Sequence, residues 1–168
     1  MKQRINPADR SLAVRILPRR VAAVLAVAVG LAACNDSPFQ VIEDLEFDPS
    51  LEIDLAQMER LPSGVYIEDV VVGTGLPVTS GSDVRVTYEG FLANGTKFGE
   101  GPLRFALGTR SVIAGFELGL IGALEFGTRK MVIPPELGYG DADQGAIPAG
   151  SVLVFLVTVD EVYDDVTP

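Results

Sequence analysis

Few side chains of this chain could do chemistry, and most of them lie in its second half. The sequence contains no histidine and one cysteine, Cys34, which excludes imidazole general bases, Ser-His-Asp triads, His-ligated metal sites and an internal disulfide. Residues 86–90, 111–116 and 137–155 place aromatic or branched apolar residues beside glycines or strands. They offer apolar groups to line a pocket, with tyrosine hydroxyls and backbone N–H groups as polar contacts. This inventory suits chemistry that needs no nucleophile, metal or cofactor, such as rotation about a bond.

Charge is divided sharply along the chain. Residues 1–33 hold six of the 13 lysines and arginines and one acid, whereas residues 34–168 hold seven basic and 22 acidic residues, a net charge of −15. Because phosphate neutralisation needs a cationic surface, the acidic part is a poor candidate for binding nucleic acid. The 168 residues leave room for one domain and an appendage. No long heptad pattern is present, so a monomer is expected.

The first 34 residues have the pattern of an export signal. Six basic residues precede an uncharged apolar run over residues 21–33, which spans about 20 Å as a helix and is shorter than the ~30 Å hydrocarbon core of a bilayer. The run ends in Leu31-Ala32-Ala33-Cys34. This tetrapeptide resembles the bacterial lipobox, in which the signal is cut before the cysteine and the cysteine is lipidated. We therefore predict a signal peptide over residues 1–33 and membrane attachment through lipidated Cys34.

This interpretation has an alternative and a consequence. The alternative is an uncleaved anchor or an ordinary signal, with Cys34 an incidental thiol. The consequence is a cell-envelope location, with the domain lipid-anchored and facing the periplasm. Asn35 follows the cysteine at the place where an aspartate is the inner-membrane retention signal of some bacteria, so the outer membrane is favoured.

Residues 34–60 are predicted to connect this anchor to the domain. Residues 35–48 are acidic, with scattered apolar residues and no clear period, which indicates a tether. Asp48 as N-cap and Pro49 at the first helical position, followed by apolar residues at helical spacing, predict a short helix over about residues 49–59.

The rest of the chain predicts a sheet and one helix. Residues 65–72 are rich in β-branched residues, and residues 84–88 alternate between apolar and polar side chains. Asn94-Gly95 is a strong signal for a two-residue hairpin turn. The fold class is therefore α+β, with five or six antiparallel strands curved over one short helix. Further strands are expected over residues 103–107, 130–133 and 152–162, the last of them central, and the helix over residues 111–124.

The order of these segments resembles the FKBP-type (macrolide-binding) peptidyl-prolyl isomerases. The match covers residues 61–163, and we predict the isomerase domain over residues 61–164. The motifs that carry it are GTG at 73–75, VTYEG at 86–90, NGTKF at 94–98, FALG at 105–108, VIAGF at 112–116, PPELGYG at 134–140, IP at 147–148 and LVF at 153–155.

The resemblance implies a half-barrel of strands wrapped over the helix, with a prolyl pocket between them. Phe116 would form the pocket floor, where the family usually has a tryptophan. The Tyr139 hydroxyl and the Ile113 backbone N–H would hold substrate carbonyls. The implied substrates are proline-containing, incompletely folded polypeptides, and no cofactor or metal is implied. The remaining residues implied to bind substrate are Tyr88, Phe98, Leu103, Val112, Ile147 and Phe155.

Several positions depart from the family pattern. Gly99 stands where an aspartate is common, and Leu103 where many members have a second aromatic residue. The loop expected over residues 99–102 is several residues shorter than the common form and lacks its usual arginine. These differences predict a reduced affinity for macrolides and leave open whether the isomerase rate is also lower. The tip that follows Gly140 is also more polar than usual, with Asp141, Asp143 and Gln144.

Other functions could use the same residues. A chaperone-like module would hold proline-containing segments without catalysis, and Gly99 and the short loop favour it. A structural lipoprotein would use the fold as a docking surface for an envelope partner. Phe116, Phe155 and Val112 would also be apolar as simple core residues of any small sheet-and-helix domain.

Overall fold

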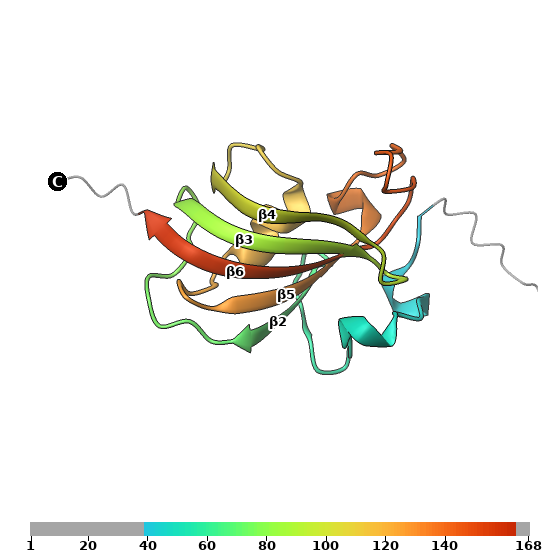
Figure 1. Cartoon of the computed structure of the whole chain (residues 1–168), viewed down its shortest axis with the longest axis horizontal. Coiled ribbons are helices and arrows are strands. Elements are labelled where there is room, and N and C mark those ends of the chain that lie inside the picture. The colour runs from blue at the N-terminus through green and yellow to red at the C-terminus, as the bar shows by residue number, and fades with distance from the viewer. Residues whose placement is uncertain (1–38, 164–168) are drawn as a thin grey trace, which may run out of the picture. The chain divides into compact units, whose positions relative to one another are not determined.

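A six-stranded antiparallel sheet with one helix across a face makes up the folded part of the chain (Figure 1). The computed structural model describes residues 39–163, so the predicted signal peptide and Cys34 lie outside the described residues. Along the sheet the strand order is β1-β2-β5-β6-β3-β4. The strands are β1 Glu59–Arg60, β2 Tyr66–Val71, β3 Asp83–Leu92, β4 Lys97–Ala106, β5 Thr128–Ile133 and β6 Leu153–Tyr163. The helices are α1 Ala114–Leu120 and the 3-10 turns η1 Ile42–Asp44, η2 Pro49–Leu51 and η3 Pro135–Leu137.

The sheet confirms the predicted α+β class. β6 pairs with β5 on one side and β3 on the other, as its apolar character on both faces predicted. The Asn94-Gly95 hairpin joins β3 to β4, where Gly95 adopts a φ of 82° and its N–H donates to the Leu92 carbonyl at 2.9 Å. No helix within residues 39–163 is long and apolar enough to cross a membrane.

Each face of the sheet is covered by a different part of the chain. On the inner face, side chains of β3, β5 and β6 pack with α1 around Phe116 and Leu120. On the outer face, a smaller cluster that includes Val132 and Val154 packs under residues 39–58, which we call the N-terminal strap. The buried side chains of the strap are Ile42, Leu51 and Met58. The described part of the predicted tether is therefore packed against the domain.

The predicted helix over residues 49–59 is wrong. The Asp48 side chain does cap a turn, since its carboxylate accepts from the Ser50 N–H at 2.9 Å, but the turn is the three-residue η2. Glu52 then adopts a left-handed φ of 51°, which ends the helical conformation. The chain instead follows the outer face, where burial of Leu51 and Met58 replaces helix formation.

Two other segments differ from their predicted form. The helix expected over residues 111–124 is limited to Ala114–Leu120, because Ile113 directly before it is extended and Gly122 follows it with a φ of 82°. The loop expected over residues 99–102 does not exist. Gly99 pairs with Gly90 and Pro102 with Thr87, so β4 continues through this segment as an edge strand.

Candidate active site

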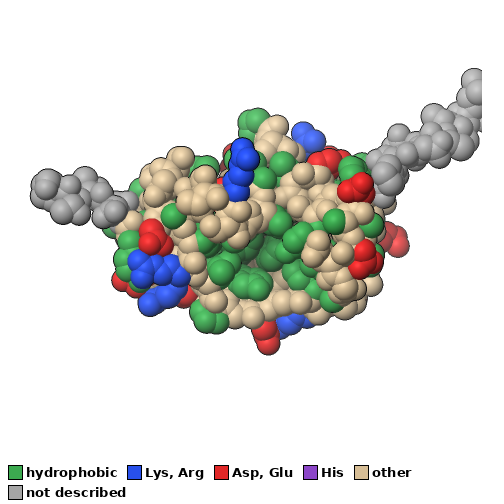
Figure 2. All heavy atoms as spheres, turned by 90° about the horizontal axis from the view of Figure 1, so that it is seen from above, with side chains coloured by type: hydrophobic (Ala, Val, Ile, Leu, Met, Phe, Trp, Pro, Cys, Tyr) green, Lys and Arg blue, Asp and Glu red, His purple; other side chains and the backbone are tan. Residues whose placement is uncertain are grey.

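A pocket of about 440 Å³ opens between β4 and the loops that flank α1 on the inner side of the sheet. Figure 2 shows it as a hollow lined by hydrophobic side chains, with lysine, arginine and acidic side chains at its periphery. The structure brings all nine sequence-predicted pocket residues together in this lining. They are Tyr88, Phe98, Leu103, Val112, Ile113, Phe116, Tyr139, Ile147 and Phe155.

The floor of the pocket is a cluster of aromatic rings in edge-to-face contact. Phe116 is 3% exposed, and its ring centroid lies 5.1 Å from that of Phe155 at an interplanar angle of 80°. Phe98 contacts Phe155 in the same way at 5.5 Å, and Tyr88 contacts Phe116 at 6.2 Å. Such contacts fix ring orientation more tightly than aliphatic packing does. The floor is therefore a rigid apolar surface, whose rings also serve as core.

β-strand alternation explains why β3 can supply this floor. Val84, Val86, Tyr88 and Gly90 point to the inner face, while the residues between them point outward. Gly90 is required by the rings, because a Cβ there would lie 2.6 Å from Phe98 Cε2 and 3.0 Å from Phe155 Cε1. The missing side chain at Gly90 thus makes room for two aromatic rings of the pocket.

Several polar groups in the lining are free to bind a substrate. Within residues 39–163, the tyrosine hydroxyls that form hydrogen bonds are those of Tyr66 and Tyr163, so the hydroxyls of Tyr88 and Tyr139 find no partner there. Tyr139 is 38% exposed. The Ile113 N–H also finds no partner within the described residues, since Ile113 precedes the first turn of α1. Its carbonyl accepts from the N–H groups of Phe116 and Glu117. Unpaired donors around an apolar floor suit recognition of peptide carbonyls.

The loop before α1 is fixed by a carboxylate. Glu117 of α1 accepts hydrogen bonds from the N–H groups of Gly108 at 3.2 Å and Arg110 at 3.1 Å. Gly115, two residues earlier, allows α1 to contact the sheet closely, because a Cβ there would clash with Ile133 Cγ2. Together these contacts hold Val112 and Ile113 at the pocket rim.

Three lining residues were not among the predicted site residues. Gly99, Ser111 and Gln144 complete the lining. A Cβ on Gly99 would lie 3.3 Å from the Tyr88 hydroxyl, so the glycine leaves that hydroxyl open to the pocket. Gln144 belongs to the polar tip noticed in the sequence, but nothing in the sequence alone placed its side chain in the pocket. No side chain of the lining carries a charge.

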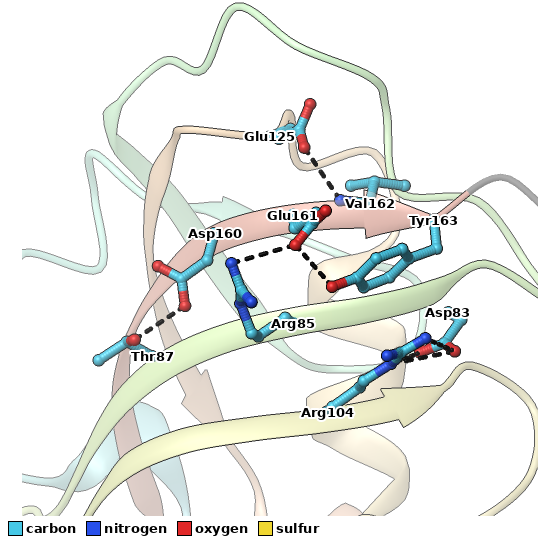
Figure 3. Close-up of polar contacts among 9 residues, drawn as sticks. All are labelled: Asp83, Arg85, Thr87, Arg104, Glu125, Asp160, Glu161, Val162 and Tyr163. Carbon is cyan, nitrogen blue, oxygen red and sulfur yellow. Dashed lines mark hydrogen bonds and ion pairs between the residues drawn. The ribbon is translucent and has the colours of Figure 1, made fainter.

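The charged side chains gather elsewhere, on the outer face near the end of β6 (Figure 3). Arg85 pairs with Glu161 at 3.0 Å, and Arg104 pairs with Asp83 at 2.9 Å while its guanidinium lies 4.1 Å from the Tyr163 ring centroid. The hydrogen bond to Asp83 raises the pKa of Arg104 above its usual value. These half-exposed pairs stabilise the sheet modestly. They take no part in the pocket, and residues 39–163 contain no group of three or more Cys, Asp and Glu that could hold a metal.

Fold and site together define a class of protein: a curved antiparallel sheet over one helix, with an aromatic pocket that binds without a charged or nucleophilic group. The family described as FKBP-type peptidyl-prolyl cis-trans isomerase matches residues 76–160, about half of the chain. The FK506-binding protein of Neisseria meningitidis serogroup B is 40% identical over 107 residues, which are 60% of this chain and 98% of that protein.

Solved structures give the same result. AtFKBP13 superposes with a TM-score of 0.58 at 33% identity, covering 63% of this chain and 98% of that one. FkpA from Escherichia coli superposes with a TM-score of 0.58 at 34% identity, covering 63% of this chain and 51% of that one. The chain belongs to the FKBP-type peptidyl-prolyl cis-trans isomerase family, and it is an enzyme of that class. The family and the activity implied by the sequence motifs are thus confirmed.

Proposed function

We propose that this isomerase acts on prolines in exported, incompletely folded polypeptides, as a monomer anchored in the bacterial cell envelope with its pocket facing the periplasm. The observation that carries the catalytic part is the uncharged aromatic pocket, with the hydroxyls of Tyr88 and Tyr139 and the Ile113 N–H left free around it. The lipobox-like sequence ending at Cys34 supports the location. Slow X-Pro isomerisation limits folding, which gives the activity a use outside the cytoplasm.

The proposed mechanism is preferential binding of the twisted peptide bond. Rotation of a peptide bond faces a barrier of ~18–20 kcal/mol because amide resonance is lost. The twisted amide has less charge separation than the planar one, so the apolar floor formed by Phe116 and Phe155 disfavours the planar form relatively more. Hydrogen bonds from the Tyr139 hydroxyl and the Ile113 N–H to substrate carbonyls hold the twisted backbone. Catalysis is then differential binding, with no covalent step and no proton transfer to the enzyme.

Gly99 interrupts the side chains of the pocket wall. There the pocket wall has no side chain, and the Tyr88 hydroxyl is exposed to the ligand. Relatives carry the name FK506-binding protein, and we propose that this pocket also accepts macrolides. The affinity is expected to be reduced, because no side chain at position 99 orients the Tyr88 hydroxyl.

Exchange NMR tests the catalytic part directly. The full-length chain, purified in detergent, is added to a short peptide containing Leu-Pro or Phe-Pro, and the exchange rate between its cis and trans proline signals is measured. Acceleration that disappears in Phe116→Ala supports the pocket as the site. No acceleration by a folded sample would contradict isomerase activity toward this substrate class.

A second comparison separates catalysis from holding. Tyr139→Phe removes one hydroxyl and leaves the apolar floor intact. An isomerase loses rate in this variant, whereas a chaperone-like holdase keeps its full effect on aggregation of an unfolded protein.

The membrane location is tested by Cys34→Ser. This variant is expected to abolish incorporation of labelled palmitate and to release the protein from the membrane fraction. Retention of the label would contradict lipidation at Cys34.

A further inference from the structure

The pocket's tip loop, residues 139–150, carries three lining residues on a segment with little regular structure. Tyr139, Gln144 and Ile147 all project from it into the pocket. Inside the loop, the Gln144 N–H donates to the Ile147 carbonyl at 3.0 Å, and the Gly145 N–H donates to Asp143 Oδ1 at 2.9 Å. These contacts shape the tip, but they do not attach the loop to the domain.

The loop is closed at its neck by backbone hydrogen bonds. The Gly150 N–H donates to the Gly140 carbonyl at 2.7 Å, and the Gly140 N–H donates to the Pro135 carbonyl at 2.8 Å. Gly150 adopts a φ of 73°, a conformation that other residues rarely adopt. The position of Tyr139, directly before Gly140, therefore depends on how firmly Gly150 is held.

Gln40 of the N-terminal strap holds the opposite side of this neck. Its backbone N–H donates to the Gly150 carbonyl at 3.0 Å. Its side-chain Oε1 accepts from the N–H of Val152 at 2.9 Å, across 112 residues of sequence. Val152 is fully buried and directly precedes β6, so its N–H has no solvent to bond if the Gln40 oxygen is removed. Ile42, 4% exposed, fixes the strap two residues further on.

We infer that Gln40 is a positioning residue for catalysis, which holds the neck of the tip loop and through it Tyr139. The inference rests on the isomerase activity of the pocket and adds a residue outside the segment that matches the family, residues 76–160. The strap thus has a second role besides covering the outer face. Gly150 is held on both sides: its N–H donates to the Gly140 carbonyl within the loop, and its own carbonyl accepts from the Gln40 N–H of the strap. The Gln40 side chain adds the bond to the Val152 N–H.

Three variants of the full-length chain test this role. Gln40→Met keeps side-chain length and the backbone N–H but removes the acceptor for Val152. Gln40→Glu restores an acceptor oxygen. Gln57→Met makes the same chemical change at an exposed strap residue whose side chain forms no hydrogen bond among the described residues, and it serves as the matched control.

We expect Gln40→Met to lower kcat/KM for a Leu-Pro peptide roughly three- to tenfold, a change equivalent to the net contribution of one hydrogen bond. Faster hydrogen exchange at the Val152 amide and increased motion of the Tyr139 and Gly140 amides in ¹⁵N relaxation should accompany the loss. Gln40→Glu should recover activity to within about twofold of wild type, and Gln57→Met should not differ from it.

Two results would overturn the inference. In the first, Gln40→Met exposes the Val152 amide to exchange while kcat/KM stays at the wild-type value, so the contact exists without positioning the site. In the second, Gln40→Glu fails to recover activity or Gln57→Met loses as much, so the effect is general to the strap. An inactive wild type would instead contradict the isomerase assignment, and the relaxation of Tyr139 and Gly140 would still decide whether Gln40 holds the loop.

Discussion

The two faces of the sheet are built from the same strands, but they differ in side-chain chemistry and in how fully they are covered. On the inner face, β3, β4 and β6 present aromatic rings that leave a pocket of about 440 Å³ open beside α1. On the outer face, aliphatic residues such as Val132 and Val154 are sealed under the N-terminal strap, and charged pairs occupy the rest. The inner face is thus adapted to bind a ligand, and the outer face to stabilise the sheet that holds it.

Two neighbouring residues on β6 serve these two roles, stability on the outer face and ligand binding on the inner face. Val154 and Phe155 are consecutive and both nearly buried, yet one packs under the strap and the other forms the pocket floor. Alternation along a strand places them on opposite sides. Substitutions at these adjacent positions should therefore affect stability and catalysis separately, which tests whether the inner and outer faces have different functions.

The largest effect is expected for Phe155→Ala on the inner face. The variant removes a ring that contacts Tyr88, Phe98 and Phe116, so the free energy of unfolding should fall by about 3–5 kcal/mol. Catalysis by the molecules that remain folded should also be lost. Urea unfolding and peptide exchange NMR measure the two effects. Wild-type kcat/KM in folded Phe155→Ala would show that the ring is core only.

Val154→Ala on the outer face should lower the free energy of unfolding by about 2 kcal/mol, since Val154 is 2% exposed and its loss leaves a cavity under the strap. In contrast to its neighbour, the variant should retain wild-type kcat/KM per folded molecule. The same two measurements apply. A drop in activity comparable to that of Phe155→Ala would mean that the two faces are not functionally separate.

Gly90→Ala sharpens the comparison, because it adds an atom to the pocket wall instead of removing one. Its Cβ would push against the rings of Phe98 and Phe155, and overpacking of this kind costs about 1–3 kcal/mol. We expect KM to rise as the rings move into the pocket. Steady-state kinetics and the melting temperature check this. An unchanged KM in a stable variant would show that the rings yield without narrowing the pocket.

The smallest effect is expected from pH at the strap. The Tyr66 hydroxyl donates to Glu43 Oε1 at 2.7 Å, and this hydrogen bond, more than the nearby Arg60, holds the pKa of Glu43 below its usual value. A lowered carboxyl pKa stabilises the fold above the unfolded-state pKa, and the contribution is lost as pH falls through the folded-state value. Because Glu43 is half-exposed, its contribution should stay below about 1 kcal/mol.

Urea unfolding between about pH 7 and about pH 3 tests this contribution. The loss of stability on acidification should be slightly smaller in Glu43→Gln than in wild type, with no difference in activity between the two at neutral pH. An equal loss in both proteins would mean that the contact between the strap and β2 does not depend on the carboxylate.

Local signals in the sequence predicted the parts of the fold that short segments decide. The alternation over residues 84–88, the Asn94-Gly95 turn and the apolar strand ending the domain all appear as expected. The helix predicted over residues 49–59 fails for an instructive reason. Asp48 can cap an α-helix or a 3-10 turn equally well. The 3-10 turn forms because it allows Leu51 and Met58 to be buried against the sheet.

The pocket shows the same division. Its aromatic residues are identifiable from their motifs, but the prediction of a loop at Gly99 fails because no local signal in the sequence shows that β4 pairs with β3 through Pro102. Gln144 stands out in the sequence as a polar residue where the family often has apolar ones, but its place in the pocket lining depends on the tertiary structure. The roles of Tyr139, Ile113 and Phe116 remain predictions until variants are measured, although the structure brings all three to one pocket.

By itself, the sequence determined which face of each strand is apolar, where the hairpin turns, and which residue types meet a ligand, because these depend on alternation and on turn conformations within a few residues. Only the tertiary structure decided that residues 39–58 cover the sheet and that Gln40 reaches Val152. Contacts across 112 residues leave no periodic signal in the chain. They form because a folded sheet offers a buried N–H that some other segment must satisfy.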